Sequence, residues 1–226
     1  MKDNKAQETE SKEALVIRPP NMKTVIFKIR GTAPLVQHRF SAKTQNQMKQ
    51  KMEEGSTTRK GKNREPVDMD EMYNNARYVS KEGWDGFNAS SIRCAMVRAC
   101  SLVGYKMTLA KMSFFVIQDG WDAKQPEIPL IRIIGEPRKM EMIGKVETGQ
   151  PYVCVRPCYD EWKAEVCIKY DADLFKLEDV ANLMSRVGCQ VGIGEGRPSS
   201  PNSSGMGWGT FTLEDNESSA PLKNAC

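Results

Sequence analysis

Residues 188–215 read GCQVGIGEGRPSSPNSSGMGWGTFTLED, and this stretch holds seven of the chain's 17 glycines. Glycine is costly to order, so it is used where the backbone must turn at positive φ or approach another group closely. The stretch follows a predicted helix over 176–188 and enters a predicted strand. This helix-to-strand order is the reverse of the order that a dinucleotide-binding turn requires. We therefore interpret the glycine-rich stretch as a backbone cradle for an anion or for a neighbouring chain.

Apolar periodicity outside this stretch predicts two amphipathic helices and a series of strands. In residues 23–35, KTVIFKIRGTAPL, alternate residues are apolar, which indicates a strand with one buried face. The clearest helix covers 88–104, with Asn88 or a serine as its N-cap and Gly104 at its end. The second covers 176–188. Further elements are a short helix within 67–79, strands over 113–120, 127–136, 149–157 and 161–171, and a segment 138–147 that is a candidate partner for 127–136.

The order of these elements predicts an α+β fold. Without its insertions the chain is β-α-β-β-α-β, the ferredoxin-like (RRM-related) arrangement, with two helices on one face of an antiparallel sheet. We expect a single domain over 21–215, with a basic insertion at about 41–86 and a hairpin insertion at about 119–160. Residues 1–20 are expected to be a disordered tail, and residues 216–226 to be frayed.

Composition narrows the classes of function. The net charge of +4 permits a nucleic-acid partner, and the basic residues concentrate between Lys49 and Arg64. No apolar run approaches the roughly 20 residues that span a bilayer, and the N-terminus has no apolar signal region. We expect a cytoplasmic protein, in a bacterium or a host cell, without membrane contact. Seven cysteines without a CxxC pair predict neither disulfides nor a metal site, and no cofactor motif is present.

Cations and small residues near the predicted loops are the candidate binding residues. An arginine can donate two parallel hydrogen bonds to a phosphate, and lysines on a mobile arm can bind phosphates by charge. An aromatic ring can stack on a base. Trp208, with Phe40, would supply stacking. The candidates for phosphate and backbone contacts are Arg39, Lys60, Lys62, Arg64, Ser90, Ser91, Arg93, Arg98, Gly192, Gly194, Gly196 and Arg197.

Three segments together carry a resemblance to a known family. GIGEGRPSSPNSSGMGWGTFTL (192–213) resembles the C-terminal glycine-rich loop of the CRISPR-associated RAMP superfamily. FKIRGTAPLVQHRF (27–40) resembles that family's opening strand, and GFNASSIRCAMVRAC (86–100) resembles its segment of small residues and serines that leads into an arginine-bearing helix. The chain is closer to the backbone subunits than to the processing endonucleases. A free-standing relative from a phage or another mobile element fits equally.

The resemblance implies a protein that binds single-stranded nucleic acid without catalysis. It implies RNA more than DNA as the ligand, with subunits side by side along the strand and the basic insertion acting as a thumb. Two alternatives remain. One is a metal-independent RNA-processing endoribonuclease that uses His38, the only histidine, as a general acid or base. The other is a protein-only filament or virion assembly module. Whether the protein is an enzyme stays open, and the scarcity of catalytic motifs argues against it.

Overall fold

A computed structural model describes residues 18–39, 68–145, 151–200 and 205–214. Its central sheet has four antiparallel strands in the spatial order β11-β1-β10-β5. These strands are β1 (Met22–Gly31), β5 (Phe114–Ile117), β10 (Lys163–Asp171) and β11 (Phe211–Leu213). The helices α3 (Ala89–Leu102) and α5 (Leu177–Arg186) complete the chain order β1-α3-β5-β10-α5-β11. The predicted ferredoxin-like α+β fold is confirmed.

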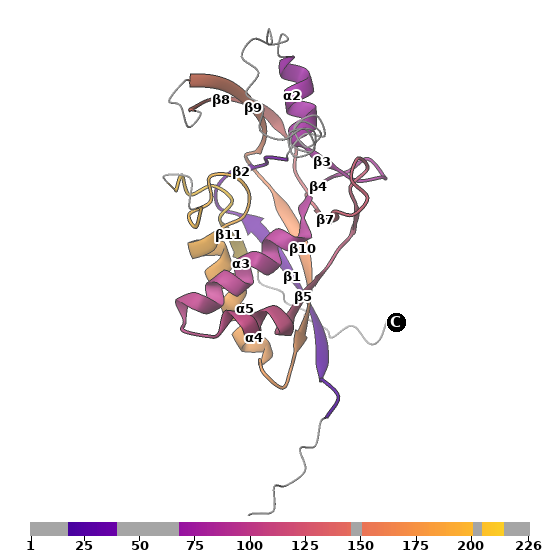
Figure 1. Ribbon diagram of the computed structural model, residues 1–226, viewed down its shortest axis with the longest axis vertical. Coiled ribbons are helices and arrows are strands. Elements are labelled where there is room, and N and C mark those ends of the chain that lie inside the picture. The colour runs from indigo at the N-terminus through magenta and orange to yellow at the C-terminus, as the bar shows by residue number, and fades with distance from the viewer. Residues whose placement is uncertain (1–17, 40–67, 146–150, 201–204, 215–226) are drawn as a thin grey trace, which may run out of the picture.

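The core lies between this sheet and the two helices, which cover the same face (Figure 1). The alternation read in the first strand is observed, because Phe27 and Ile29 are buried while Lys28 and Arg30 are exposed. Every second residue of β10 is also buried, from Ala164 to Tyr170. Period-two burial of this kind places one face of the sheet against the helices and leaves the other face uncovered by them.

Two smaller sheets extend the domain beyond this core. One has the order β2-β9-β8 and the other β3-β4-β7-β6. Their strands are β2 (Leu35–Val36), β8 (Arg138–Lys145) and β9 (Pro151–Tyr159), then β3 (Tyr78–Val79), β4 (Asp85–Asn88), β6 (Gly120–Trp121) and β7 (Pro129–Arg132). The helix α2 (Met69–Ala76) lies beside β8 and β9 at one end of the molecule (Figure 1).

Some local predictions are confirmed and others are corrected. Asn88 caps α3 by accepting a hydrogen bond from the backbone N–H of Ser90. The segment 138–147 was a candidate partner of 127–136, but its strand β8 pairs with β9, from Arg138 opposite Cys158 onward. A short connection between β8 and β9 makes that hairpin the nearer partner. The helix α4 (Met107–Ser113) was not predicted, because its exposed apolar residues obscure the helical period.

Several sequence-based predictions lie outside the described residues. They include the thumb-like candidates Lys60, Lys62 and Arg64, the stacking candidate Phe40, and most of both predicted tails. The expected hairpin insertion at about 119–160 contains the strands β6, β7, β8 and β9. None of the helices in the described ranges is both long and apolar enough to cross a membrane.

Candidate nucleic-acid interface

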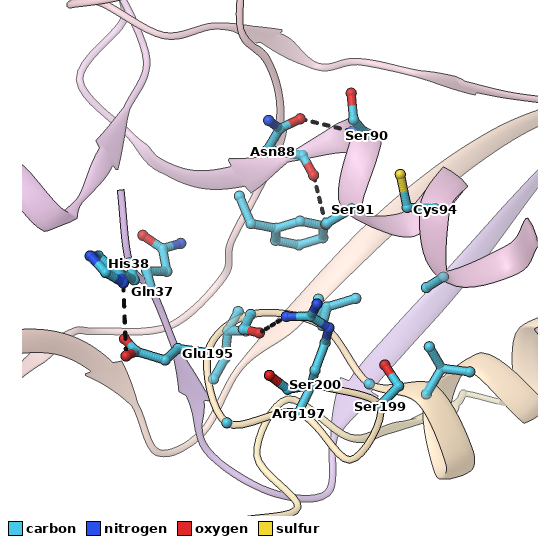
Figure 2. Close-up of a pocket in the computed structure, with 18 of the residues that line it drawn as sticks. Gln37, His38, Asn88, Ser90, Ser91, Cys94, Glu195, Arg197, Ser199 and Ser200 are labelled. Carbon is cyan, nitrogen blue, oxygen red and sulfur yellow. Dashed lines mark hydrogen bonds and ion pairs between the residues drawn. The ribbon is translucent and has the colours of Figure 1, made fainter. Parts of the chain in front are cut away.

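Three segments that are distant in sequence meet around one cavity of about 700 Å³ (Figure 2). The first runs from β2 to His38, the second from Phe87 at the end of β4 to Arg98 in α3, and the third is residues 191–200. Each of them overlaps one of the three segments that carried the family resemblance. Their side chains include Gln37, His38, Asn88, Ser90, Ser91, Cys94, Arg98, Glu195, Arg197, Ser199 and Ser200.

Backbone hydrogen bonds hold the glycine-rich loop in place. A five-residue π-helix, η1 (Val187–Val191), follows α5 and delivers the chain to Gly192. The Glu195 N–H then donates to the Val36 carbonyl at 2.9 Å, and the Ile193 N–H donates to the Gly209 carbonyl at 3.0 Å. The loop is therefore tied both to the end of β2 and to the segment before β11, and it is an ordered wall of the cavity.

Gly194 is required at the closest approach of this loop to β2. Its φ is +77°, and a Cβ at this position would lie 2.6 Å from the Val36 carbonyl oxygen. Any other residue would combine a disfavoured backbone conformation with a steric clash. The backbone N–H groups of Gly194 and Gly196 donate to no other residue among those described. The loop therefore keeps unpaired donors beside the cavity, which is what a backbone cradle for an anion needs.

Two arginines bring positive charge to the cavity. Arg98 donates from Nη1 to the Ser199 carbonyl at 2.6 Å, and Arg197 donates from Nη1 to the Gly194 carbonyl at 2.9 Å. Each contact uses one of the five N–H donors of a guanidinium. The remaining donors stay available for a ligand, while these contacts fix the two side chains against the loop. Figure 2 shows the Arg197 side chain crossing the space between the loop and α3.

The start of α3 adds polar groups to the opposite wall. Ser90 is exposed there, and the Ser91 hydroxyl donates to the Asn88 carbonyl at 2.7 Å. The first turn of a helix carries backbone N–H groups without intrahelical partners, and the helix dipole favours negative charge near them. The hydroxyl oxygen of Ser199, on the loop side, is buried and has no hydrogen-bond partner in the described part of the chain.

His38 lies at the rim of the cavity within a charged cluster. Its Nδ1 is 3.8 Å from Oε1 of Glu195, whose other carboxylate oxygen accepts from Nε of Arg156 at 2.8 Å. Desolvation is the largest effect on His38 and lowers its pKa, as does the Arg156 charge, while the Glu195 carboxylate opposes both. The imidazole is therefore mainly neutral at pH 7, and the Glu195 charge is balanced by Arg156.

Three candidate residues within the described ranges do not line the cavity. Arg39 is buried and donates from Nη2 to Asp122 at 3.0 Å, because burial of a guanidinium requires a charged partner. Arg93 donates to the carbonyl oxygens of Phe114 and Lys111, and so joins α3 to β5 and α4. The Trp208 ring packs on Gly196, where a Cβ would lie 2.4 Å from its Cε3. These three side chains have partners within the fold.

Several lining residues were not singled out from the sequence. Gln37 donates to the Gly86 carbonyl at 2.6 Å and connects the end of β2 to β4, and Tyr78 and Cys94 reach the cavity from β3 and α3. These residues can be identified only from the folded structure, in which the elements that carry them pack around the cavity. Ser199 and Ser200, by contrast, lie inside the glycine-rich stretch and could have been proposed from its composition. Among the described residues, no group of three or more His, Cys, Asp or Glu side chains is placed to hold a metal ion.

Comparisons with known proteins give a distant likeness among solved structures. No protein-family model matches the chain, and no curated protein matches it. Among solved structures, a chain from a cryo-EM structure of the Type III-B Cmr-beta complex bound to cognate target RNA is similar, with a TM-score of 0.42 and 10% identity. The alignment covers 86% of this chain and 59% of that one, so this chain spans less than two thirds of its length.

Proposed function

We propose that this protein binds single-stranded nucleic acid, RNA in preference to DNA, at the cavity between the glycine-rich loop and α3. The observation that carries the proposal is the meeting of the three segments in one cavity that holds Arg98, Arg197 and the unpaired loop amides. These donors suit the oxygens of a phosphate. We further propose that the chain is related to the CRISPR-associated RAMP superfamily and that it is not an enzyme.

At this site the protein would recognise the sugar–phosphate backbone of the strand. Arg98 and Arg197 would contact phosphates from the loop side, and Ser90 and Ser91 would contact them at the start of α3. Contacts of this kind position a strand without reading its sequence. Affinity should therefore vary little with base composition and should fall steeply with salt, since each phosphate contact releases condensed counterions.

A filter-binding titration across a range of salt concentrations tests this proposal. We expect the double variant Arg98→Gln, Arg197→Gln to lose about tenfold or more in affinity for a labelled single strand at low salt. The log–log salt slope should also become shallower by about one to two. The matched control is Arg30→Gln, which removes an exposed arginine of β1 that does not line the cavity. An equal loss in both variants, or no binding by the native chain at low salt, would refute the proposal.

Chemical modification of cysteines tests the location of the bound strand. Cys94 and Cys189 are both exposed, but only Cys94 lines the cavity. We expect saturating RNA to slow alkylation by iodoacetamide at Cys94 and to leave Cys189 unchanged, as read by mass spectrometry of each peptide. Unchanged alkylation at Cys94 under saturating RNA would place the strand elsewhere on the protein. Running RNA and DNA of the same sequence in parallel gives the preference between them.

Assembly along the strand is the second part of the proposal. We propose that several copies bind side by side on one strand, as the resemblance to backbone subunits implies. Negative-stain microscopy with and without a long single strand tests this. Extended particles that form only with the strand support it. Particles that form equally without nucleic acid would instead favour a protein-only assembly module.

A ribonuclease is the second candidate function, and one contact favours it. Glu195 lies 3.8 Å from Nδ1 of His38 and could orient the imidazole as a general acid or base. Metal-free cleavage of structured RNA that is lost in His38→Ala and reduced in Glu195→Gln would support this function. Binding without cleavage would support the first proposal, and the two variants would then retain affinity.

A further inference from the structure

Several exposed apolar side chains lie on helices at the end of the molecule opposite α2, and they form one group. It combines the C-terminal end of α3, the helix α4 and the start of α5 (Figure 1). Met112 is 65% exposed and Leu102 is 56% exposed. We call this the α4 surface, and its residues are Leu102, Val103, Met107, Met112, Leu174 and Leu177.

Aromatic contacts join the segments that carry the α4 surface. Tyr105 follows α3, and its ring centroid lies 4.9 Å from that of Phe175 in the loop before α5. Phe175 also contacts Phe114 at the start of β5, with centroids 4.5 Å apart. The loop that carries Leu174 is therefore anchored against the connection between α3 and α4. The two segments that carry these exposed side chains are therefore packed against each other.

The exposed side chains of α4 are not needed to bury the helix. Ala110 and Ser113 are buried and hold α4 against the domain, while Met107 and Met112 face outward. Exposed apolar side chains gathered on neighbouring elements mark a site of interaction on a folded protein. Methionine is also enriched in the cores of protein–protein interfaces, where its flexible thioether adapts to the partner.

The charges around the α4 surface point to one kind of partner. Residues 102–113 include Lys106 and Lys111 and no acidic residue. Residues 171–179, which pack against the α3–α4 connection through Phe175, include four acidic residues, among them Glu178, and one lysine. A surface with a basic side, an apolar centre and an acidic side is complementary to itself under a two-fold rotation. The acidic side would also repel a nucleic-acid strand or an anionic membrane.

We propose that the α4 surface binds the α4 surface of a second copy of this chain, forming a two-fold dimer. Met112 and Leu102 lie near the centre of the interface. The lysines of one copy face the acidic residues of the other, with Lys111 opposite the region of Glu178. This interface does not use the cavity, so it is independent of strand binding and of association along a strand.

Sedimentation velocity of the full chain without nucleic acid tests the dimer over a series of protein concentrations. We expect a concentration-dependent shift from monomer to dimer. Met112→Asp should weaken the dimer about tenfold or more, because two carboxylates would be placed in the apolar centre. The matched control is Ile143→Asp on β8, because Ile143 is also an exposed apolar residue but lies outside the α4 surface. That control should leave the dimer unchanged.

A charge exchange tests the two-fold arrangement. Lys111→Glu and Glu178→Lys should each weaken the dimer, and the two together in one chain should restore it, because the opposite charges meet again across the axis. Circular dichroism should show all variants folded, as the altered side chains are exposed. A native chain that stays monomeric at every concentration would overturn the proposal. So would equal effects of Met112→Asp and Ile143→Asp, failure of the double exchange, or pairing only with a different protein.

Discussion

The two ends of α3 differ in what they offer to a partner. At its N-terminal end, Asn88, Ser90 and Ser91 bring polar groups to a cavity whose other wall is the glycine-rich loop. At its C-terminal end, Leu102 and Val103 remain exposed beside the methionines of α4. The glycine-rich loop that faces the first end is held by backbone hydrogen bonds, and the second end carries apolar area that the domain itself does not bury. One buried helix therefore separates a site suited to a polyanion from a surface suited to another protein.

The largest effect is expected in the glycine segment that supports the cavity. Gly209 has a φ of +66°, and a Cβ there would lie 1.8 Å from the Ile193 carbonyl oxygen. Gly209→Ala should therefore lower the free energy of unfolding by about 3 kcal/mol or more. Gly207 has a similar φ of +75° with open space around it, so Gly207→Ala should cost only about 1–2 kcal/mol. Urea titrations measure both free energies of unfolding. Equal losses for the two variants would show that the close approach of the Gly209 backbone to Ile193 does not stabilise the glycine segment.

A pair of truncations compares the interior of α3 with its exposed end. Ile92 is fully buried, so Ile92→Ala should lower the free energy of unfolding by about 2–5 kcal/mol. Leu102→Ala removes a similar volume from an exposed position and should change the free energy of unfolding by less than about 0.5 kcal/mol. Both are read from urea unfolding at a protein concentration where the chain is monomeric. A large loss for Leu102→Ala would mean that the α4 surface is part of the core and is not available to a partner.

The smallest effect concerns the pH dependence of the cavity rim. Because His38 is the only histidine, its imidazole signal in an NMR titration is unambiguous, and its midpoint should fall below 6.5. Glu195→Gln should lower that midpoint further, since the carboxylate raises the pKa of His38. The folded state then binds fewer protons than the unfolded state just below pH 6.5. The contribution of His38 to stability is present above that pH and is lost as the pH falls toward the folded-state pKa.

The converse result would change the assignment of charge at the rim. A midpoint above 6.5 would mean that the Glu195 carboxylate outweighs both desolvation and the Arg156 charge. The imidazole would then add a positive charge to the cavity near neutral pH. His38→Gln should abolish the pH dependence of stability between about pH 5 and 7 that belongs to this group.

Much of the fold could be predicted from local patterns in the sequence. The alternation in β1, the N-cap at Asn88 and the amphipathic period of α5 are properties of short segments, and each depends on side chains that face one common core. Their order along the chain was sufficient for the ferredoxin-like topology. The pairing of β8 with β9 and the helix α4 were not predicted, because strand partners and exposed apolar helices depend on what lies beside them.

The candidate site divides in the same way. By itself the sequence determined that Arg197 and the glycines at 192, 194 and 196 belong to one stretch of unusual composition, and that Arg98 belongs to an amphipathic helix. Only the tertiary structure decided that Arg98 and Arg197 reach one cavity while Arg39 and Arg93 bind partners within the fold. The type of a residue sets which contacts its side chain can make. The packing of distant segments sets which contacts it does make, since a buried charge takes the nearest partner that offsets its desolvation.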